Sequence, residues 1–126
     1  MKPGNRGKRG TGMEDCLFCK IIKGEIPSQK VYEDGDTYAF RDISPQAKTH
    51  VLVVCKEHVP DMAHADALTD EQLAACLRTC AKVAKLLHVE ESGYRVVSNC
   101  GPDACQSVGH MHYHVLGGEK LSPRMV

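Results

Sequence analysis

The sequence predicts an α+β fold: an antiparallel sheet of about five strands, covered by one long helix and preceded by a short N-terminal helix. Three observations lead to this prediction. The chain has 126 residues, enough for one domain with its own apolar core. Short β-type segments occur in runs, and the first two are joined by an Asp-Gly turn. Only one segment has the apolar spacing of a long amphipathic helix.

The predicted elements begin with a short helix and a hairpin. Asp15 is a suitable N-cap for a helix over residues 16–23, where a glycine follows the last turn. Residues 30–33 are predicted to form a strand, and residues 36–41 return beside it after the Asp-Gly turn.

The middle of the chain supplies a third strand and the long helix. Residues 50–54 are the segment richest in β-branched residues. Thr69 and Gln72 have the spacing of a capping box, which begins a helix running to about residue 88. Apolar residues recur there at steps of three and four, so one face is apolar: Leu73, Leu77, Cys80, Ala84 and Leu87.

Two further strands complete the sheet. Residues 94–99 alternate in polarity, and residues 100–109 contain the glycines and proline of a loop. Residues 111–116 form the last predicted strand, which ends at a Gly-Gly pair. Strands in runs beside one long helix favour an antiparallel sheet with the helix on one face.

Composition and charge exclude several classes of function. The formal net charge is zero, so the charge balance gives no reason to expect a nucleic-acid partner. No apolar run approaches the ~20 residues that span a bilayer, so we expect no membrane partner. The first twelve residues hold four cations, no acid and no apolar signal region. We therefore expect residues 1–13 to be a disordered basic extension and residues 14–126 to form the domain.

The seven cysteines indicate a reducing compartment. An odd count without a secretory signal argues against a disulfide framework, so we expect a cytoplasmic location, with the nucleus as an additional compartment. Cys16 and Cys19 have the spacing of zinc ligands and equally that of two inert thiols buried by one helix. A redox pair is disfavoured, because the strand–helix junction of thioredoxin-like motifs is missing.

Three histidines alternate within five residues: His110, His112 and His114. In a strand, side chains two residues apart share a face and are about 7 Å apart along the strand. The intervening residues point to the other face, where they can pack on the long helix: Met111, Tyr113 and Val115. A solvated strand face and a three-histidine metal site are alternatives, but residues in a straight row do not converge easily on one ion.

Imidazole chemistry indicates what such a row can do. Near neutral pH a histidine can be a nucleophile, a base or a cation, and its neighbours can supply positive charge to an oxyanion. The preceding loop offers the Gln106 amide, the Ser107 hydroxyl and backbone N–H groups as donors to phosphate oxygens. No Walker pattern is present. The row of histidines beside this donor-rich loop therefore favours a reaction in which a histidine attacks phosphorus.

The segment QSVGHMHYHVLGG, residues 106–118, resembles the motif of the histidine triad (HIT) family. The segments FCKIIKGEIP, VYEDGDTYAF and RDISPQAKTHVLVV agree, so the resemblance covers about residues 15–118. DISPQA and the HVLGG ending are similar to the Hint branch, the purine nucleoside phosphoramidases, rather than to the Fhit-like branch.

The resemblance implies hydrolysis of purine nucleoside 5′-phosphoramidates through a nucleotidyl-histidine. It implies that His112 is the nucleophile, that the His110 carbonyl holds its other ring nitrogen, and that His114 contacts the α-phosphate. His50 would be a proton-relay partner, and Ser107 would contact the phosphate or the leaving group. Two alternative functions are a dinucleoside polyphosphate hydrolase and a nucleotide-binding interaction module with vestigial catalysis.

The same resemblance implies a nucleotide pocket. Asn99 would bind phosphate or the ribose edge, Gln106 would contact phosphate or the leaving group, and Asp42 would accept the ribose hydroxyls. Apolar residues would form the base pocket: Phe18, Ile21, Phe40 and Ile43. Read from the residues alone, Asp42 could equally cap a turn, Asn99 could satisfy loop backbone, and the aromatic residues could be plain core.

The resemblance further implies a homodimer that needs no cofactor for catalysis. Some HIT proteins complete a structural zinc site with two histidines, which here are His58 and His110 beside Cys16 and Cys19. Zinc and inert thiols both stay open. The ending EKLSPRMV departs from the Trp-Pro-Pro ending of many Hint proteins, so the preferred leaving group is not implied.

Overall fold

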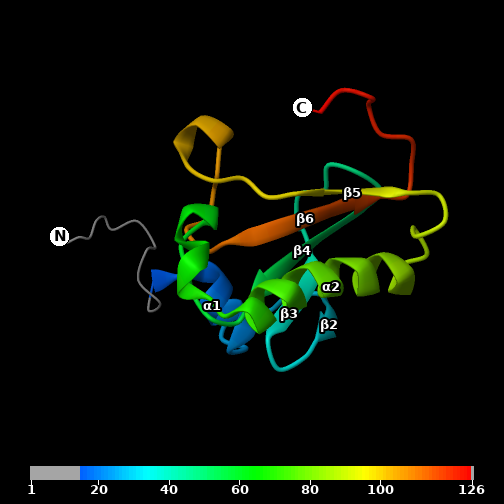
Figure 1. The fold of residues 1–126 in the computed structure, drawn as a ribbon. Helices are drawn as coiled ribbons and strands as arrows, with labels where there is room; N and C mark the ends of the chain where they lie inside the picture. Colours follow the sequence, from blue (N-terminus) through cyan, green and yellow to red (C-terminus); the bar gives the residue numbers. More distant parts are fainter. Residues whose placement is uncertain (1–14, 126) are drawn as a thin grey trace.

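The computed structural model describes residues 15–125 and has the predicted α+β architecture (Figure 1). The predicted extension over residues 1–13 lies outside the described residues. One antiparallel five-stranded sheet has the order β2-β3-β4-β6-β5. Its strands are β2 (Lys30–Glu33), β3 (Thr37–Arg41), β4 (Thr49–Cys55), β5 (Tyr94–Val97) and β6 (His112–Gly117).

The long helix α2 (Asp70–Leu86) lies across one face of the sheet (Figure 1). The predicted capping box is confirmed: the Gln72 N–H donates to Thr69 Oγ1 (3.1 Å), and the Thr69 N–H donates to Gln72 Oε1 (2.8 Å). The helix ends slightly before the predicted residue 88, because His88 has a left-handed φ of 62°. Its core partners include the three residues predicted to face it: Met111, Tyr113 and Val115.

One residue of the predicted apolar helix face is exposed. Leu77 is 60% exposed, whereas Cys80 and Ala84 of that face are buried, together with Cys76 and Val83. The buried stripe of α2 therefore takes Cys76 in place of Leu77, which lies about 100° around the helix from it.

A short helix, α1 (Leu17–Ile22), packs on the other face of the sheet. Its N-cap is Cys16 rather than the predicted Asp15, because Cys16 Sγ accepts the Cys19 N–H at 3.4 Å. Alternate strand residues meet this helix, and together they form a second apolar cluster: Phe18, Cys19, Ile21, Tyr38, Phe40, Leu52 and Val54.

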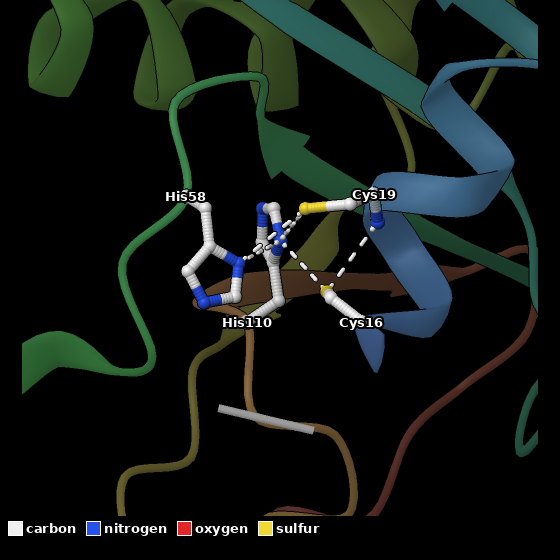
Figure 2. A group of neighbouring side chains, drawn as sticks. All are labelled: Cys16, Cys19, His58 and His110. Carbon is white, nitrogen blue, oxygen red and sulfur yellow. Dashed lines mark hydrogen bonds between the residues drawn. The ribbon is translucent and has the colours of Figure 1, made fainter. Parts of the chain in front are cut away.

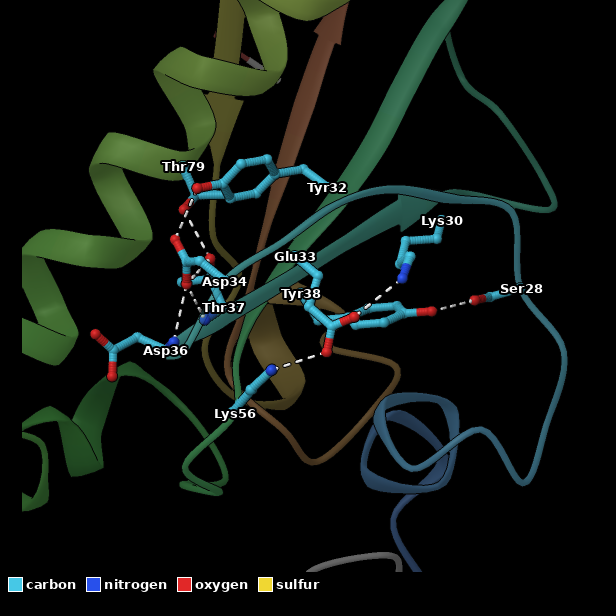
Figure 3. A network of polar contacts seen from close by, with 10 residues as sticks. All are labelled: Ser28, Lys30, Tyr32, Glu33, Asp34, Asp36, Thr37, Tyr38, Lys56 and Thr79. Atoms are coloured by element: carbon cyan, nitrogen blue, oxygen red, sulfur yellow. Dashed lines mark hydrogen bonds and ion pairs between the residues drawn. The ribbon is translucent and has the colours of Figure 1, made fainter.

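A polar network fixes the β2–β3 hairpin to α2 (Figure 3). Asp34 Oδ1 accepts the N–H groups of Asp36 and Thr37, both at 2.8 Å. Asp36 belongs to the turn, and β3 begins at Thr37 rather than at the predicted residue 36. The hydroxyls of Thr37 and Thr79 lie 2.7 Å apart, both fully buried, and join the strand to the helix.

Other differences occur at strand ends and in connections. β5 stops at Val97 rather than residue 99, and the next side chain, Ser98 Oγ, donates to the His112 carbonyl at 2.8 Å. Two short 3-10 helices are present: η2 (Met62–Ala67) precedes α2, and η3 (Pro102–Ala104) lies in the predicted loop over residues 100–109. Among the residues described, no helix is both long and apolar enough to cross a membrane.

Candidate active site

The triad lies at the sheet face that α1 covers. His112 and His114 alternate on β6 and are in register with Val54 and Leu52 of β4. The ring centroids of His112 and His114 are 5.1 Å apart, and those of His50 and His114 are also 5.1 Å apart. His112 and His50 are buried, whereas His114 is half-buried. The predicted alternation therefore brings the rings of His112 and His114 together, and β4 adds that of His50.

The ring of His112 is held in one tautomer. Its Nδ1 lies 2.7 Å from the carbonyl oxygen of His110, which can only accept, so Nδ1 carries the proton and Nε2 carries a lone pair. Burial lowers the pKa of His112, although the hydrogen bond to the His110 carbonyl acts in the opposite direction. Phe18 packs its ring edge-on against the imidazole at 5.1 Å. This arrangement is that of a neutral, oriented nitrogen nucleophile.

A second chain of hydrogen bonds orients His114. The backbone N–H of Gln46 donates to His50 Nδ1 (3.0 Å), so the proton of neutral His50 is on Nε2. That N–H faces His114 Nδ1 at 2.9 Å and the Asp42 carboxylate at 3.5 Å. His114 then carries its own proton on Nε2. Burial lowers the pKa of His114 to about 4, and the neighbouring His112 and His50 act in the same direction.

Asp42, His50 and His114 place three ligand-type atoms within 4.8 Å of one another. The Gln46 N–H occupies His50 Nδ1 and keeps the proton on Nε2, so this nitrogen donates a hydrogen bond and is not free to bind a metal. Burial lowers the pKa of His50, and the nearby Asp42 raises it in part. We interpret this group as a proton-carrying chain.

The loop before the triad is braced by Gln106. Its Nε2 donates to the carbonyls of Pro60 and Val108, both at 2.8 Å, and its Oε1 accepts the Gly101 N–H at 2.9 Å. Both of its N–H groups are therefore used within the protein, and a phosphate contact from this side chain would replace one of these bonds. Ser107, on the same loop, is exposed.

The residues predicted to bind the nucleoside divide into two groups. Phe18, Ile21 and Phe40 are buried together as part of the α1 cluster, with Phe18 against His112. Ile43 is 97% exposed and lies apart from that cluster. Asp42 does cap a turn, through Oδ1 and the Ser44 N–H (2.7 Å), while its Oδ2 faces His50.

Asn99 is half-buried after the end of β5, and the described residues include no hydrogen-bond partner for its side chain. Its amide is therefore able to contact a ligand.

The remaining triad ring belongs to a separate cluster of cysteines and histidines (Figure 2). His110 Nδ1 lies 3.3 Å from Cys16 Sγ, 3.6 Å from Cys19 Sγ and 3.1 Å from His58 Nδ1. Cys19 Sγ and His58 Nδ1 are 3.4 Å apart. All four ligand atoms lie within 4.8 Å of one another.

These distances fit a tetrahedral zinc ion. Zinc–ligand bond lengths place two nitrogens about 3.3 Å apart and a nitrogen and a sulfur about 3.6 Å apart. His110 Nε2 donates to the Cys55 carbonyl at 2.8 Å, which leaves the lone pair on Nδ1, directed at the cluster. Burial raises the pKa of Cys16, but hydrogen bonds to His110 and His58 outweigh it and bring the pKa to about 5. A thiolate beside two imidazoles is a zinc-binding donor set.

Three contributions to the site were not predicted. They are the Gln46 N–H on His50, the Cys55 carbonyl on His110 and the Ser98 hydroxyl on the His112 carbonyl. Two of them come from backbone atoms, which carry no residue-type signal. Ser98 lies within the segment predicted as a strand, where a single serine carries no functional signal.

Comparison with known proteins agrees with this geometry. The HIT domain family matches residues 23–121. The chain is 40% identical over 112 residues to the purine nucleoside phosphoramidase of Escherichia coli (strain K12), covering 89% of this chain and 94% of that protein. It is 48% identical over 108 residues to a 14 kDa zinc-binding protein of Zea mays, covering 84% of each. A solved HIT family hydrolase from Clostridium thermocellum superposes with a TM-score of 0.83 at 41% identity, covering 90% of this chain and 98% of that one.

Proposed function

The chain belongs to the HIT family of nucleotide hydrolases, and from this premise we propose that it hydrolyses purine nucleoside 5′-phosphoramidates. The products would be a nucleoside monophosphate and an amine. The observation that carries the proposal is the orientation of His112, whose Nδ1–H is held by the His110 carbonyl at 2.7 Å. A similar protein in Escherichia coli has the name purine nucleoside phosphoramidase.

In the first step, His112 Nε2 attacks the α-phosphorus and forms a P–N bond to the enzyme. The bond from phosphorus to the substrate amine breaks, and its electron pair stays on the departing nitrogen. That nitrogen takes a proton from the His50–His114 pair, whose rings are joined at 2.9 Å. The pair is neutral in the free protein, and the negative charge of a bound phosphate favours its protonated form.

In the second step, water hydrolyses the nucleotidyl-histidine. Water supplies an oxygen to phosphorus, the P–N bond to His112 breaks, and the proton of the water returns to the His50–His114 pair. Negative charge on the phosphate oxygens is met by His114 Nε2–H and by donors of the preceding loop such as the Ser107 hydroxyl.

The nucleoside would lie toward α1. Phe18 and Phe40 would offer apolar surface to a purine, and the Asp42 carboxylate would accept ribose hydroxyls. The rings of Phe18 and Phe40 pack against each other, with centroids 5.5 Å apart. A purine would therefore either separate the two rings or lie against their outer edge.

Turnover of an AMP–amine phosphoramidate, measured beside diadenosine polyphosphates at equal concentration, tests the proposal. We expect the phosphoramidate to be hydrolysed faster. Faster hydrolysis of the polyphosphates would make the chain a dinucleoside polyphosphate hydrolase, and binding of AMP without turnover of either would make it an interaction module.

We propose in addition that Cys16, Cys19, His58 and His110 hold a structural zinc ion. The support is the tetrahedral spacing of their ligand atoms and the 48% identity to a protein from Zea mays that is named as zinc-binding. When bound, the ion would tie α1 to the start of β6. Elemental analysis of protein purified without chelators decides this: less than about one tenth of an equivalent of zinc would favour inert thiols.

A homodimer is also part of the proposal. β5 is an edge strand of the sheet, and Tyr94 and Val96 on it are more than one third exposed. Leu77 and Leu86 of α2 are exposed as well. Strand edges and exposed apolar side chains are commonly covered by a partner. Sedimentation at micromolar protein should give about 28 kDa, twice the 13.8 kDa chain, and a monomer would contradict it.

The free cysteines are consistent with a proposed location in the cytoplasm or nucleus.

A further inference from the structure

A pocket lies beside the loop that precedes the triad, here called the catalytic loop (residues 100–109). The proposed nucleoside site does not use this pocket. One wall is the segment that leads into η2, and the other is the loop before the triad; its lining includes Pro60, Asp61, His64, Gly101, Ser107 and Gly109. None of the residues proposed to hold the base or the ribose lines this pocket. It is therefore available to another part of the substrate.

The pocket has a definite charge. Asp61 is its one carboxylate, and no lysine or arginine is among the described residues that line it. Asp61 Oδ1 lies 2.7 Å from His64 Nδ1, and the side chains are 21% and 60% exposed. Its other oxygen has no hydrogen-bond partner within residues 15–125. The pocket therefore presents a half-buried acceptor with a vacant oxygen.

The pocket is joined to the reaction centre through its loop wall. Ser107 and Gly109 line it, and the next residue, His110, supplies the carbonyl that holds the nucleophile His112. Gln106 bonds the Pro60 carbonyl to the same loop, so the two walls are held at a fixed spacing. Ser107, which is proposed to donate to the phosphate, and Asp61 line the same pocket.

The chemistry of the proposed reaction says which group this is. Phosphorus carries three kinds of substituent: the nucleoside, the non-bridging oxygens and the amine. The nucleoside would lie against Phe18 and Asp42, and the oxygens would be bound by histidine and loop donors. In an in-line displacement, the leaving amine points away from the attacking nitrogen, so it is the part left to occupy the pocket.

We propose that this pocket receives the leaving amine and that Asp61 selects amines carrying a second positive charge, such as an aliphatic diamine. The inference rests on the proposed phosphoramidase function. The distal ammonium would pair with the vacant Asp61 oxygen, while the apolar chain would lie along Pro60 and the loop. An ion pair at a partly exposed site contributes a modest preference, on the order of fivefold in kcat/KM.

The test compares two adenosine 5′-phosphoramidates of matched shape. One carries 1,5-diaminopentane, and the other carries hexylamine, in which a methyl group replaces the distal ammonium. We expect the wild type to prefer the diamine by about fivefold in kcat/KM and Asp61→Asn to bring the ratio close to one. Asp66→Asn is the matched control, because Asp66 is exposed on η2 and does not line the pocket, so the preference should persist.

The outcomes separate the inference from the function on which it rests. Turnover of both substrates with a ratio that Asp61→Asn does not change would overturn the inference and leave the phosphoramidase function intact. Turnover of neither substrate would overturn both. If Asp61→Asn fails to fold, His64→Ala decides, since it removes the competing partner of Asp61 from an exposed position and should raise the diamine preference. An unchanged ratio in that variant would overturn the inference.

Discussion

The two faces of the sheet are built from the same strands but do different work. Under α2, a helix of 17 residues closes the face, and apart from Thr37 the strand side chains packed beneath it are mainly apolar and buried. Under α1, a helix of 6 residues covers only part of the face, and histidines replace aliphatic residues. Because neighbouring residues on a strand point to opposite faces, one strand provides both packing and chemistry.

The polar groups of the two faces also differ. Under α2, the Thr37 hydroxyl donates to Asp34 Oδ1 at 3.0 Å and accepts from the Thr79 hydroxyl at 2.7 Å, so neither threonine has a free donor to offer. Under α1, His112 and His114 each direct one ring nitrogen to a partner inside the protein, which fixes the role of the other nitrogen. The difference is that the histidine rings keep one nitrogen available for the proposed chemistry, whereas the threonine hydroxyls are used within the protein.

The sharpest test of this comparison uses two adjacent residues that point to opposite faces: His112, the first residue of β6, and Met111, which precedes it. His112→Asn should lower turnover by about three powers of ten or more, since an amide cannot form the nucleotidyl intermediate. AMP should still bind. Mass spectrometry of a quenched reaction should show one nucleotidyl adduct in the wild type, on the peptide with His112. Wild-type turnover in the variant would contradict the mechanism.

Met111→Ala is the opposite case. Met111 is 1% exposed in the α2 core, and truncating such a side chain costs about 2–5 kcal/mol of unfolding free energy. Denaturant unfolding measures the loss. At low temperature, where the variant stays folded, we expect turnover within a fewfold of the wild type. A loss of turnover as large as that of His112→Asn would show that the two faces are not separable.

Cys16→Ser tests whether the α1 face is held by metal. If zinc binds, the variant should lower the melting temperature by at least about 5 °C, and a chelator should have the same effect on the wild type. Turnover should fall less, because His112 uses the carbonyl of His110 and not its ring. Cys100→Ser is the control, since Cys100 is exposed outside the cluster. Equal melting temperatures for both variants and the wild type would leave the thiols without a metal role.

The smallest expected effect is a dependence of stability on pH. Burial lowers the pKa of His114 to about 4 from the usual 6.5, so below pH 6.5 the unfolded chain takes up a proton that the folded protein does not. Stability should therefore fall as the pH decreases from 6.5 to about 4 and level off below. Urea unfolding across this range should show a shallower fall for His114→Asn than for the wild type. His88→Asn, at an exposed position, should follow the wild type.

Local patterns predicted much of this structure. The Thr69–Gln72 capping box located the start of α2, and the His-x-His-x-His alternation predicted that His112 and His114 share one face of the sheet, because both signals depend on residues close in sequence. Helix ends and strand ends were less accurate. The N-cap of α1 is Cys16 and not Asp15. The Cys16 thiol is also held by the His110 ring, a tertiary contact that local sequence signals do not show.

The parts of the site that were not predicted depend on segments far apart in the chain. The His110 ring reaches Cys16 across 94 residues, and only the resemblance to the HIT family brought these positions together in advance. The contact of Gln106 with phosphate or the leaving group stays a prediction, while its amide bonds to Gly101, Val108 and Pro60 were not predicted. Asp61 and His64 had no local pattern at all, because their pocket exists only when η2 and the catalytic loop meet.

The alternation in β6 also limits how this segment can change in length. Inserting or deleting one residue between His110 and Val115 would reverse the orientation of every side chain beyond that point. Imidazoles would then enter the aliphatic layer beneath α2, and valine and tyrosine would replace them at the phosphorus. Length variation among descendants of this sequence should therefore accumulate in the turns on either side, whereas inside the strand only changes of residue type, or paired insertions, would keep its two roles in phase.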